Sequence, residues 1–344
     1  MVMRSTPVEG ADGKAGADIV GTAPAILPVM PAIRRPRRAK PPSVVVLGDL
    51  VLDVVLAPAR PLQASSDVPG RVALVQGGSA ANTARWIARL GGRASLIAAV
   101  GRDPTGRALV KAIRSDGVTP RVSRVAGTRT GRIGVLVAPI GDRSFVQDRG
   151  AAELLRASEL RASWFAGADA LHLPIYSLLG PLGDAGRRAL ELGRAAGLAI
   201  SIDLASIGPL LTGGRRAARA LIHEVGPDIL FATAAEVDAL LGLGQLDDLL
   251  ELASIAVVKR GAKGATVLAR DGAEVLRFEA ATKPLSAADT TVAGDAFDAG
   301  FLVGWLSARA AGRSRATALH RGVIAGHRAA ARQLSAPRTE LPIT

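Results

Sequence analysis

Cysteine is absent from this chain of 344 residues, and aromatic residues make up only 3% of it. Without cysteine there are no disulfide bonds, no thiolate zinc sites and no cysteine nucleophile. Because aromatic residues are scarce, a core must be built mainly from Ala, Leu, Val and Ile, which the 49% of hydrophobic residues supply. Histidines show neither an H-E-x-x-H motif nor a pair four residues apart, so we expect no structural metal site. They are His172, His223, His320 and His327.

Two common nucleotide-binding motifs and any long apolar segment are missing too. No G-x-x-x-x-G-K-[ST] sequence occurs, which disfavours a P-loop NTPase, and no G-x-G-x-x-G follows the first apolar run, which argues against a dinucleotide-dependent dehydrogenase. The apolar residues of 19–33 are interrupted by Pro24, Pro28 and Pro31 and are too few to cross a bilayer. We therefore expect a cytoplasmic protein that does not interact with membranes.

The first 42 residues are rich in Gly, Ala and Pro and end in a basic run over 34–40. A signal peptide carries its charges before its apolar region, whereas here they follow it. We expect a disordered basic N-terminal extension over 1–42, a globular domain over 43–334 and a C-terminal tail over 335–344. The formal net charge of +13 leaves a nucleic-acid-associated protein open as an alternative. Scattered arginines and few aromatic residues for stacking on bases argue against nucleic acid as a partner.

Apolar runs that suit strands alternate with Ala-, Leu- and Arg-rich stretches that suit helices. This alternation predicts an α/β fold whose sheet is mostly parallel and carries helices on both faces. In such sheets ligands bind beyond the carboxyl ends of the strands, where we place Asp53 and Asp203. The expected strands span 43–56, 94–100, 168–173, 198–203, 229–231, 255–259 and 265–269, and the expected helices span 80–90, 105–115, 181–196 and 215–225.

Residues 288–300, Ala-Asp-Thr-Thr-Val-Ala-Gly-Asp-Ala-Phe-Asp-Ala-Gly, place small residues and a carboxylate at the expected start of a helix over 296–306. The unpaired N–H groups and the dipole of a helix N-terminus suit a phosphate group. Asp295 lies among these donors, where it can accept a proton from an attacking hydroxyl. The segment therefore indicates a phosphoryl-transfer site, while a loop whose aspartate only caps a helix explains it equally well.

A second segment decides between these two interpretations. Residues 76–84, Gln-Gly-Gly-Ser-Ala-Ala-Asn-Thr-Ala, combine two glycines, which let a ligand approach the backbone, with Asn82, which can donate and accept hydrogen bonds toward a polyol. Together the two segments resemble the signature motifs of the ribokinase-like (PfkB) family of carbohydrate and purine kinases. The resemblance extends from about residue 43 to about residue 331, with the motifs in the family's order and spacing.

The resemblance implies a ribokinase-like three-layer α/β/α fold with a mostly parallel central sheet and a small β-sheet lid, built here from 57–76 and 123–148. A lid excludes water, which keeps phosphoryl transfer from becoming ATP hydrolysis. The implied activity is transfer of the γ-phosphoryl group of Mg-ATP to a primary hydroxyl of a sugar, with a nucleoside kinase of the same family as the alternative. ATP and Mg²⁺ are the implied cofactors, and a homodimer through the lid is the implied assembly.

The site residues implied by the resemblance fall into three groups. Asp295 would act as the general base, and the anion hole would be formed by the backbone of Val292, Ala293 and Gly294. The acceptor would be bound by Asp53, Gly77, Gly78, Asn82 and Asp203. The nucleotide side would be formed by Thr233, Glu236, Lys259, Gly261 and Gly264. Glu236 would serve Mg²⁺ indirectly, through water and phosphate, and a monovalent cation such as K⁺ would lie near Asp289.

The chain departs from the family pattern at two positions. Val292 stands where the family usually has Gly, and Thr233 stands where it usually has Asn. A β-branched residue tolerates positive φ poorly, so the anion hole must form with ordinary φ or carry strain. These departures keep a third interpretation open, a catalytically weak protein that binds ATP and sugar on the same fold.

Overall fold

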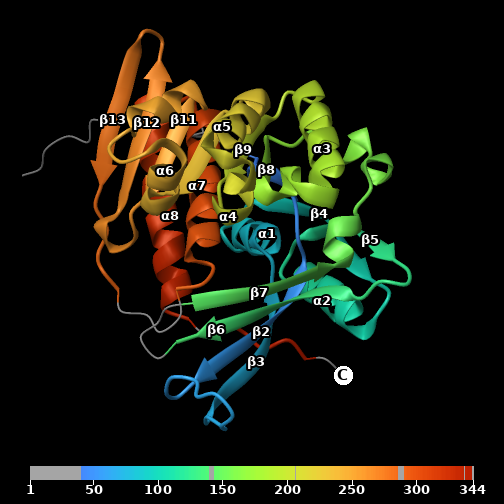
Figure 1. Cartoon of the computed structure of the whole chain (residues 1–344). Helices are drawn as coiled ribbons and strands as arrows, with labels where there is room; N and C mark the ends of the chain where they lie inside the picture. Colours follow the sequence, from blue (N-terminus) through green and yellow to red (C-terminus); the bar gives the residue numbers. More distant parts are fainter. Residues whose placement is uncertain (1–39, 139–142, 206, 286–289, 337, 343–344) are drawn as a thin grey trace, which may run out of the picture. The chain divides into compact units, whose positions relative to one another are not determined.

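The computed structural model describes residues 40–138, 143–205, 207–285, 290–336 and 338–342 (Figure 1). Residues 1–39 of the expected N-terminal extension and the expected cation residue Asp289 lie outside this range. Within it, no helix is both long enough and apolar enough to cross a membrane. The described chain forms one compact unit with two sheets, which are described in turn.

The larger sheet has nine strands in the order β13-β12-β11-β10-β9-β8-β1-β4-β5. Its strands pair in parallel from β5 to β11, and β12 and β13 add an antiparallel hairpin at one edge. The prediction of a mostly parallel α/β sheet is confirmed. The strands are β1 (Ser43–Leu47), β4 (Arg93–Gly101), β5 (Thr119–Val125), β8 (Ala170–Pro174), β9 (Ala199–Asp203), β10 (Ile229–Thr233), β11 (Ile255–Lys259), β12 (Ala265–Asp271) and β13 (Glu274–Ala280).

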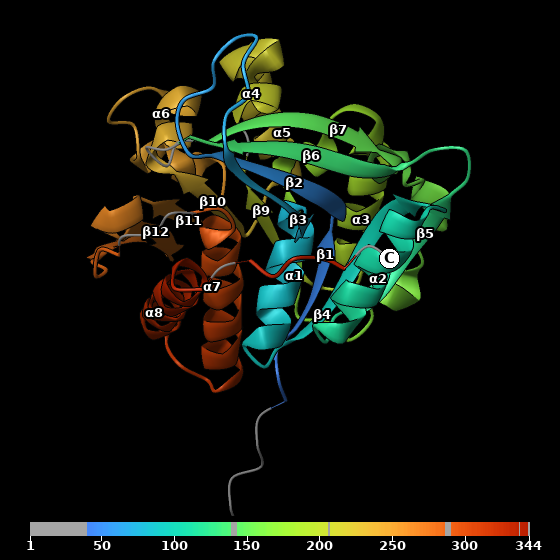
Figure 2. The ribbon, with the colours of Figure 1, turned by 90° about the horizontal axis from the view of Figure 1, so that it is seen from below.

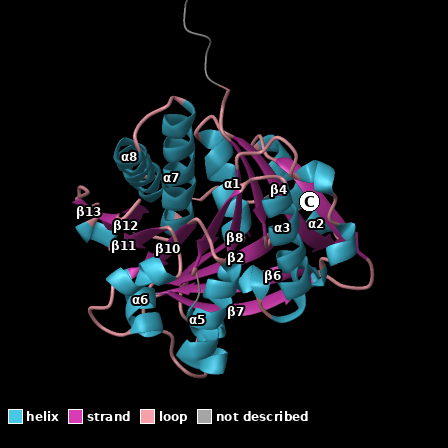
Figure 3. Ribbon diagram, turned by 90° about the horizontal axis from the view of Figure 1, so that it is seen from above, coloured by secondary structure: helices cyan, strands magenta, loops and turns pink. Residues whose placement is uncertain are grey.

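Helices cover both faces of this sheet, and β1 shows how the sequence directs them. Alternate residues of a strand face opposite sides, so Val44 and Val46 join the core beneath α1, α2, α7 and α8, while Val45 and Leu47 join the core beneath α3, α5 and α6. Figure 3 shows α1, α7 and α8 on one side of the strands and α5 and α6 on the other. The helices are α1 (Ser79–Arg89), α2 (Pro104–Ser115), α3 (Gly183–Ala195), α4 (Ile207–Leu210), α5 (Gly214–Val225), α6 (Ala234–Leu241), α7 (Ala293–Ala310) and α8 (Arg315–Leu334).

Glycines at the contact allow α7 and α8 to pack closely. A Cβ atom on Gly300 would lie 2.5 Å from the carbonyl oxygen of Ala325, and one on Gly326 would lie 2.9 Å from that of Phe297. The two helix backbones therefore approach each other at distances that a larger residue would not allow. This packing fixes the axis of α7, and with it the position of the helix start where the predicted catalytic segment lies (Figure 1).

The smaller sheet is the expected lid, with the strand order β3-β2-β6-β7. Figure 2 shows β2, β6 and β7 side by side. The lid strands are β2 (Val51–Pro58), β3 (Gly70–Gly77), β6 (Thr130–Val137) and β7 (Arg143–Gly150).

Two expected boundaries around the lid are wrong. The apolar run 43–56 is two strands, because the chain leaves the main sheet after Leu47 and enters the lid at Val51. Asp53 is therefore a lid residue and does not lie at the carboxyl end of a main-sheet strand. Residues 123–125 belong to β5 at the edge of the main sheet, not to the lid. An apolar run carries no sign of the point where it changes sheets, since strands of both sheets are built from the same residues.

The C-terminal residues 338–342 lie along the lid strand β3. The amide of Leu341 donates to the carbonyl oxygen of Leu74 at 2.8 Å, and Arg71 pairs with Glu340 at 2.9 Å. Arg338 reaches further and pairs with Asp53 of β2, with Nη1 2.7 Å from Oδ2. The expected tail thus covers part of the outer edge of the lid, which would otherwise expose unpaired backbone groups.

Candidate active site

Helix α7 begins at Ala293, and the residue before it, Val292, has φ of 71°. This left-handed backbone conformation is unfavourable for a β-branched residue. The sequence allowed either an ordinary φ or a strained, positive φ at Val292, and the structure shows the strained conformation. The turn directs the first amides of α7 toward the space in front of the helix, where an anion would meet unpaired N–H groups and the positive end of the helix dipole.

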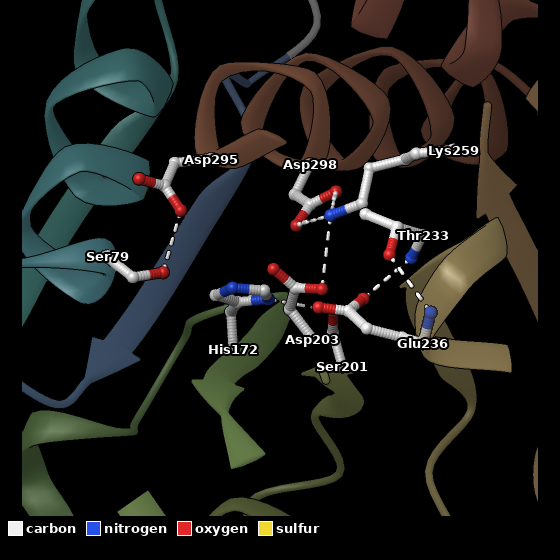
Figure 4. A network of polar contacts seen from close by, with 9 residues as sticks. All are labelled: Ser79, His172, Ser201, Asp203, Thr233, Glu236, Lys259, Asp295 and Asp298. Atoms are coloured by element: carbon white, nitrogen blue, oxygen red, sulfur yellow. Dashed lines mark hydrogen bonds and ion pairs between the residues drawn. The ribbon is translucent and has the colours of Figure 1, made fainter. Parts of the chain in front are cut away.

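Asp295 lies in the first turn of α7 and accepts hydrogen bonds from two neutral donors of α1, of which Figure 4 shows Ser79. The hydroxyl of Ser79 donates to Oδ1 at 2.7 Å, and Nδ2 of Asn82 donates to Oδ2 at 3.0 Å. Burial at the floor of the cleft raises the pKa of Asp295 to about 7, although both hydrogen bonds oppose this shift. A carboxylate with this pKa can exchange a proton near neutral pH, as a general base must.

A second charged cluster surrounds Lys259 of β11 and includes Asp298, which lies one turn further along α7 (Figure 4). The Nζ atom of Lys259 lies 3.1 Å from Oδ1 of Asp203 and 3.0 Å from Oδ2 of Asp298. Burial disfavours the charged ammonium, but the charges of Asp203 and Asp298 outweigh burial and raise the pKa of Lys259 above its ordinary value. A Cβ atom on Gly294 would lie 3.6 Å from Nζ, so this ammonium adjoins the start of α7.

Thr233 and Glu236 form a capping box at the start of α6 (Figure 4). The amide of Thr233 donates to Oε2 of Glu236 at 2.7 Å, and the amide of Glu236 donates to Oγ1 of Thr233 at 3.2 Å. Burial, together with the charge of Asp203, raises the pKa of Glu236. Threonine can cap a helix as asparagine does, so this departure from the family pattern preserves the local backbone.

Two cavities meet above the start of α7. One has a volume of about 650 Å³ and runs beneath the lid, and the other has a volume of about 890 Å³ and lies beside the Gly261–Gly264 turn. We call them the lid cavity and the turn cavity. Their common wall is formed by Arg143, Thr233, Lys259, Thr290 and Gly294. The arrangement gives two ligands separate spaces and one point of contact, next to Asp295.

The structure brings most of the predicted site residues to these cavities. The lid cavity is lined by Asp53, Gly78, Asn82, Asp203, Thr233, Glu236, Lys259, Val292, Gly294 and Asp295. The turn cavity is lined by Thr233, Lys259, Gly261, Gly264, Ala293 and Gly294. Gly77 lines neither cavity, and a Cβ atom there would lie 1.9 Å from Oδ1 of Asp53. Its part is therefore to leave room for the Asp53 side chain.

The sequence analysis missed three polar residues of the lid cavity. The hydroxyl of Tyr176 donates to Oδ1 of Asp49 at 2.5 Å, and the guanidinium of Arg149 lies 3.4 Å from Oδ2 of Asp49 and 4.2 Å from the centre of the Tyr176 ring. Burial and the charge of Asp49 raise the pKa of this tyrosine. Asp49 stood four residues before Asp53 in the sequence, but nothing local indicated its partners from β7 and from the 3-10 turn that follows β8.

Three carboxyl groups lie near the single ammonium of Lys259, and burial together with the charge of Asp203 raises the pKa of two of them, Glu236 and Asp298. Asp203, Asp298 and Glu236 face one ammonium. Within the described ranges, no three acidic or histidine side chains converge closely enough to hold a metal ion directly. Proteins usually bind Mg²⁺ with nucleotides through one or two carboxylates together with phosphate and water.

Comparison with known proteins identifies the family. The family model described as pfkB family carbohydrate kinase matches residues 41–340. The chain belongs to this family. The kinase is 30% identical over 268 residues to fructokinase-1 of Oryza sativa subsp. japonica, a match that covers 74% of this chain and 80% of that protein. The predicted family, fold and enzyme class, a phosphotransferase acting on a sugar hydroxyl, are therefore confirmed.

Solved structures give the same result for the fold. The crystal structure of adenosine kinase from Sinorhizobium meliloti is 27% identical to the kinase, with a TM-score of 0.73, and the match covers 88% of this chain and 96% of that one. A putative ribokinase II from E. coli in complex with ATP and Mg²⁺ is 24% identical, with a TM-score of 0.69, and the match covers 86% and 94%. The ribokinase-like fold predicted from the motifs is thus shared with solved kinases.

Proposed function

We propose that the protein transfers the γ-phosphoryl group of ATP to a primary hydroxyl of a sugar, with Asp295 as general base. The observation that carries this proposal is the meeting of two cavities at a carboxylate whose pKa is raised to about 7. An acceptor hydroxyl in the lid cavity would lose its proton to Asp295 as it attacks phosphorus. In-line transfer requires the attacking hydroxyl and the departing oxygen of ADP to lie on opposite sides of the phosphorus, and two cavities with one shared wall suit this geometry.

The charge of the transferring group would be met by three features of the chain. The amides of Gly294 and Asp295 would supply hydrogen-bond donors fixed before the reaction begins, whereas the amide of Ala293 donates to the carbonyl oxygen of Thr290 at 3.3 Å. Lys259 supplies a positive charge whose position is fixed by Asp203 and Asp298. Mg²⁺, which accompanies ATP in the E. coli ribokinase II structure, would neutralise phosphate charge when bound.

The turn cavity is the proposed ATP site. Gly261 has φ of 56° and Gly264 has φ of 91°, left-handed conformations that suit glycine, and neither residue adds a side chain to the cavity wall. Lys263 and Lys283 add positive charge to its wall, which favours polyphosphate. Glu236 lines the lid cavity and is hydrogen-bonded to Thr233 of the common wall, where it would orient water around a bound Mg²⁺. The cation proposed near Asp289 lies outside the described residues.

The lid cavity favours a sugar over a nucleoside. Its wall includes the carboxylates of Asp49, Asp53 and Asp203 together with Asn82, and these groups can bind several hydroxyls at once. Among the described residues, Phe145 and Tyr176 are the aromatic side chains that line it, and Tyr176 is already engaged with Asp49 and Arg149. A nucleoside acceptor remains the second candidate, since the similar structure from Sinorhizobium meliloti is an adenosine kinase.

The test is ADP release from Mg-ATP with a panel of sugars and nucleosides, with Asp295→Asn assayed in parallel. We expect release with a ketohexose or another free sugar, and loss of that release in the variant. ADP release with nucleosides only would mean that the acceptor is a nucleoside and not a sugar. ATP binding without release for any acceptor would favour the catalytically weak binding protein instead.

The outer face of the lid supports a homodimer. Leu56 and Val72 lie opposite each other in β2 and β3 and are 40% and 66% exposed, and Val146 of β7 is 77% exposed. Apolar side chains gathered on an exposed sheet are typical of an interface between subunits. Light scattering should show a dimer for the full chain and a monomer for Val72→Glu, and a wild-type monomer would contradict this assembly.

A further inference from the structure

A third cavity, outside the two that form the proposed active site, lies between α1, α8 and the C-terminal residues. It has a volume of about 300 Å³, and four arginines line it: Arg85, Arg89, Arg332 and Arg338. No acidic side chain lines it among the described residues. We call it the arginine cavity.

Positive charge in this cavity is not balanced by the carboxylates around it. Arg85 and Arg89 both bind Asp116, at 2.7 Å and 3.3 Å. Arg332 lies over the ring of Trp86, at 5.7 Å from its centre, and no carboxylate pairs with it in the part of the chain that the structure describes. Two of the four arginines therefore share one carboxylate, Arg332 has none among the described residues, and Arg338 pairs with Asp53 of β2.

The pKa of Arg85 is affected first by burial and only then by its charged neighbours. Burial lowers the pKa of this guanidinium below its ordinary value. The charges of Arg89 and Arg338 act in the same direction, and Asp116 only partly opposes them. Bringing an anion into the cavity would relieve this repulsion.

The floor of the cavity provides an independent sign of a missing ligand. Gln76 lines the cavity and is 4% exposed, and its Nε2 has no hydrogen-bond partner among the described residues. A buried amide without a partner costs about 1–3 kcal/mol, so such groups in folded proteins usually meet a ligand or a water. The unpartnered group is a donor, as the surrounding arginines are, and all of them suit an acceptor-only ligand.

We propose that the arginine cavity binds a small phosphate-bearing anion. Planar guanidinium groups bind phosphate oxygens through paired hydrogen bonds, and Gln76 Nε2 would supply one more donor from below. The volume is that of roughly ten water molecules, enough for inorganic phosphate or for the phosphate end of a larger molecule. Asn82 and Val292 line both this cavity and the lid cavity, so a bound anion would lie directly behind the proposed acceptor site.

The test measures phosphate binding to the full chain by calorimetry in a buffer without phosphate. A saturating non-hydrolysable Mg-ATP analogue is present, so that the start of α7 is not available to the titrant. Inorganic phosphate is titrated in one arm and a hexose phosphate in the other. The variants are Arg332→Gln and Gln76→Leu, and the matched control is Arg309→Gln, an arginine that lies over Trp305 as Arg332 lies over Trp86 but lines none of the three cavities.

We expect Arg332→Gln to weaken phosphate binding by about tenfold and Gln76→Leu by several-fold, with Arg309→Gln close to wild type. Equal affinity for the two titrants would identify free phosphate as the ligand, and tighter binding of the hexose phosphate would identify a phosphorylated sugar. No binding to the wild-type chain would overturn the proposal, as would an equal loss in all three variants. Since the readout is binding, the result does not depend on whether the kinase reaction occurs.

Discussion

Asp295 and Asp298 lie three residues apart on α7, and burial raises the pKa of both carboxyls, but their partners differ. Asp295 receives hydrogen bonds from the neutral side chains of Ser79 and Asn82, and its pKa is raised to about 7. Asp298 is fully buried and binds the ammonium of Lys259 through both oxygens, at 3.1 Å and 3.0 Å. A carboxylate beside neutral donors can lose and regain a proton, whereas one beside a buried ammonium serves to hold that charge in place.

Neighbouring turns of α7 can therefore carry a base, Asp295, and a carboxyl that holds a nearby cation, Asp298. If Lys259 bound Asp295 directly, its charge would keep that carboxylate ionised and weaken it as a base. Asp298 and Asp203 hold the ammonium one turn away, close to Gly294 but not in a hydrogen bond with Asp295. In the sequence Gly-Asp-Ala-Phe-Asp, the aspartate proposed to accept the proton and the aspartate that binds Lys259 are thus one helix turn apart.

The largest effect is expected when the titrating carboxylate is replaced. Asp295→Asn should lower kcat by about two to four orders of magnitude, the usual contribution of a general base. Because the folded-state pKa of Asp295 is raised, the folded protein holds this proton more tightly, and stability is lost as the pH rises from about 4 to about 7. The variant removes that loss and should be more stable than wild type by about 1–2 kcal/mol at pH 8.

ADP release and urea unfolding at pH 8 measure the two consequences of Asp295→Asn. The matched control is Asp238→Asn in α6, which is outside the three cavities and should leave both quantities unchanged. A variant that lost activity together with stability would mean that Asp295 holds the fold and does not act as the base.

Replacing the fixed cation should lower stability, and it also removes the positive charge that Lys259 would supply to the transferring group. Lys259→Met leaves the buried carboxylates of Asp203 and Asp298 without their shared partner, and removing one member of a buried ion pair costs about 3–5 kcal/mol. The double variant Lys259→Met with Asp298→Leu should recover part of this loss in urea unfolding, because one of the two stranded carboxylates is removed as well. If the single variant were as stable as wild type, the two carboxylates would have to be protonated in the folded protein, and Lys259 would not be the fixed charge.

The pH dependence of kcat/KM tests the pKa of Asp295. With a pKa of about 7, Asp295 should make kcat/KM fall by about tenfold for each pH unit below pH 7. Ser79→Ala removes a donor that stabilises the ionised form, so it should move the midpoint upward by about one unit. A midpoint near pH 4 in wild type would show that the carboxylate is not desolvated when the substrates are absent.

The sequence revealed one of these aspartates and not the other, for a physical reason. Asp295 belongs to a local pattern of small residues at a helix start, and a local pattern is visible in a sequence. The role of Asp298 depends on Lys259, which lies 39 residues away, and that of Asp53 depends partly on Arg338, which lies 285 residues away. Partners so distant are brought together only by the fold, and the sequence gives no distance between them.

The fold itself was easier to predict than its boundaries. Alternating apolar runs and helical stretches indicated the parallel sheet, because each βα unit carries its own pattern of hydrophobic residues. The run 43–56 was predicted as one strand although it contains two. Gly48 and Asp49, which lie between β1 and β2, interrupt the apolar pattern too briefly to indicate a change of sheet.

The smallest effect concerns the strained residue that precedes both aspartates. Val292 has φ of 71°, and a β-branched residue in this conformation costs on the order of 1 kcal/mol or more. Val292→Gly should relieve that strain and raise the free energy of unfolding by about 1 kcal/mol, and it should raise kcat several-fold if strain disturbs the first amides of α7. Val292→Ala is the control, because alanine lacks the β-branch but keeps the penalty on positive φ, and its effect should fall between valine and glycine. A loss of activity in the glycine variant would mean that the valine side chain, which lines both the lid cavity and the arginine cavity, contributes to the wall between them.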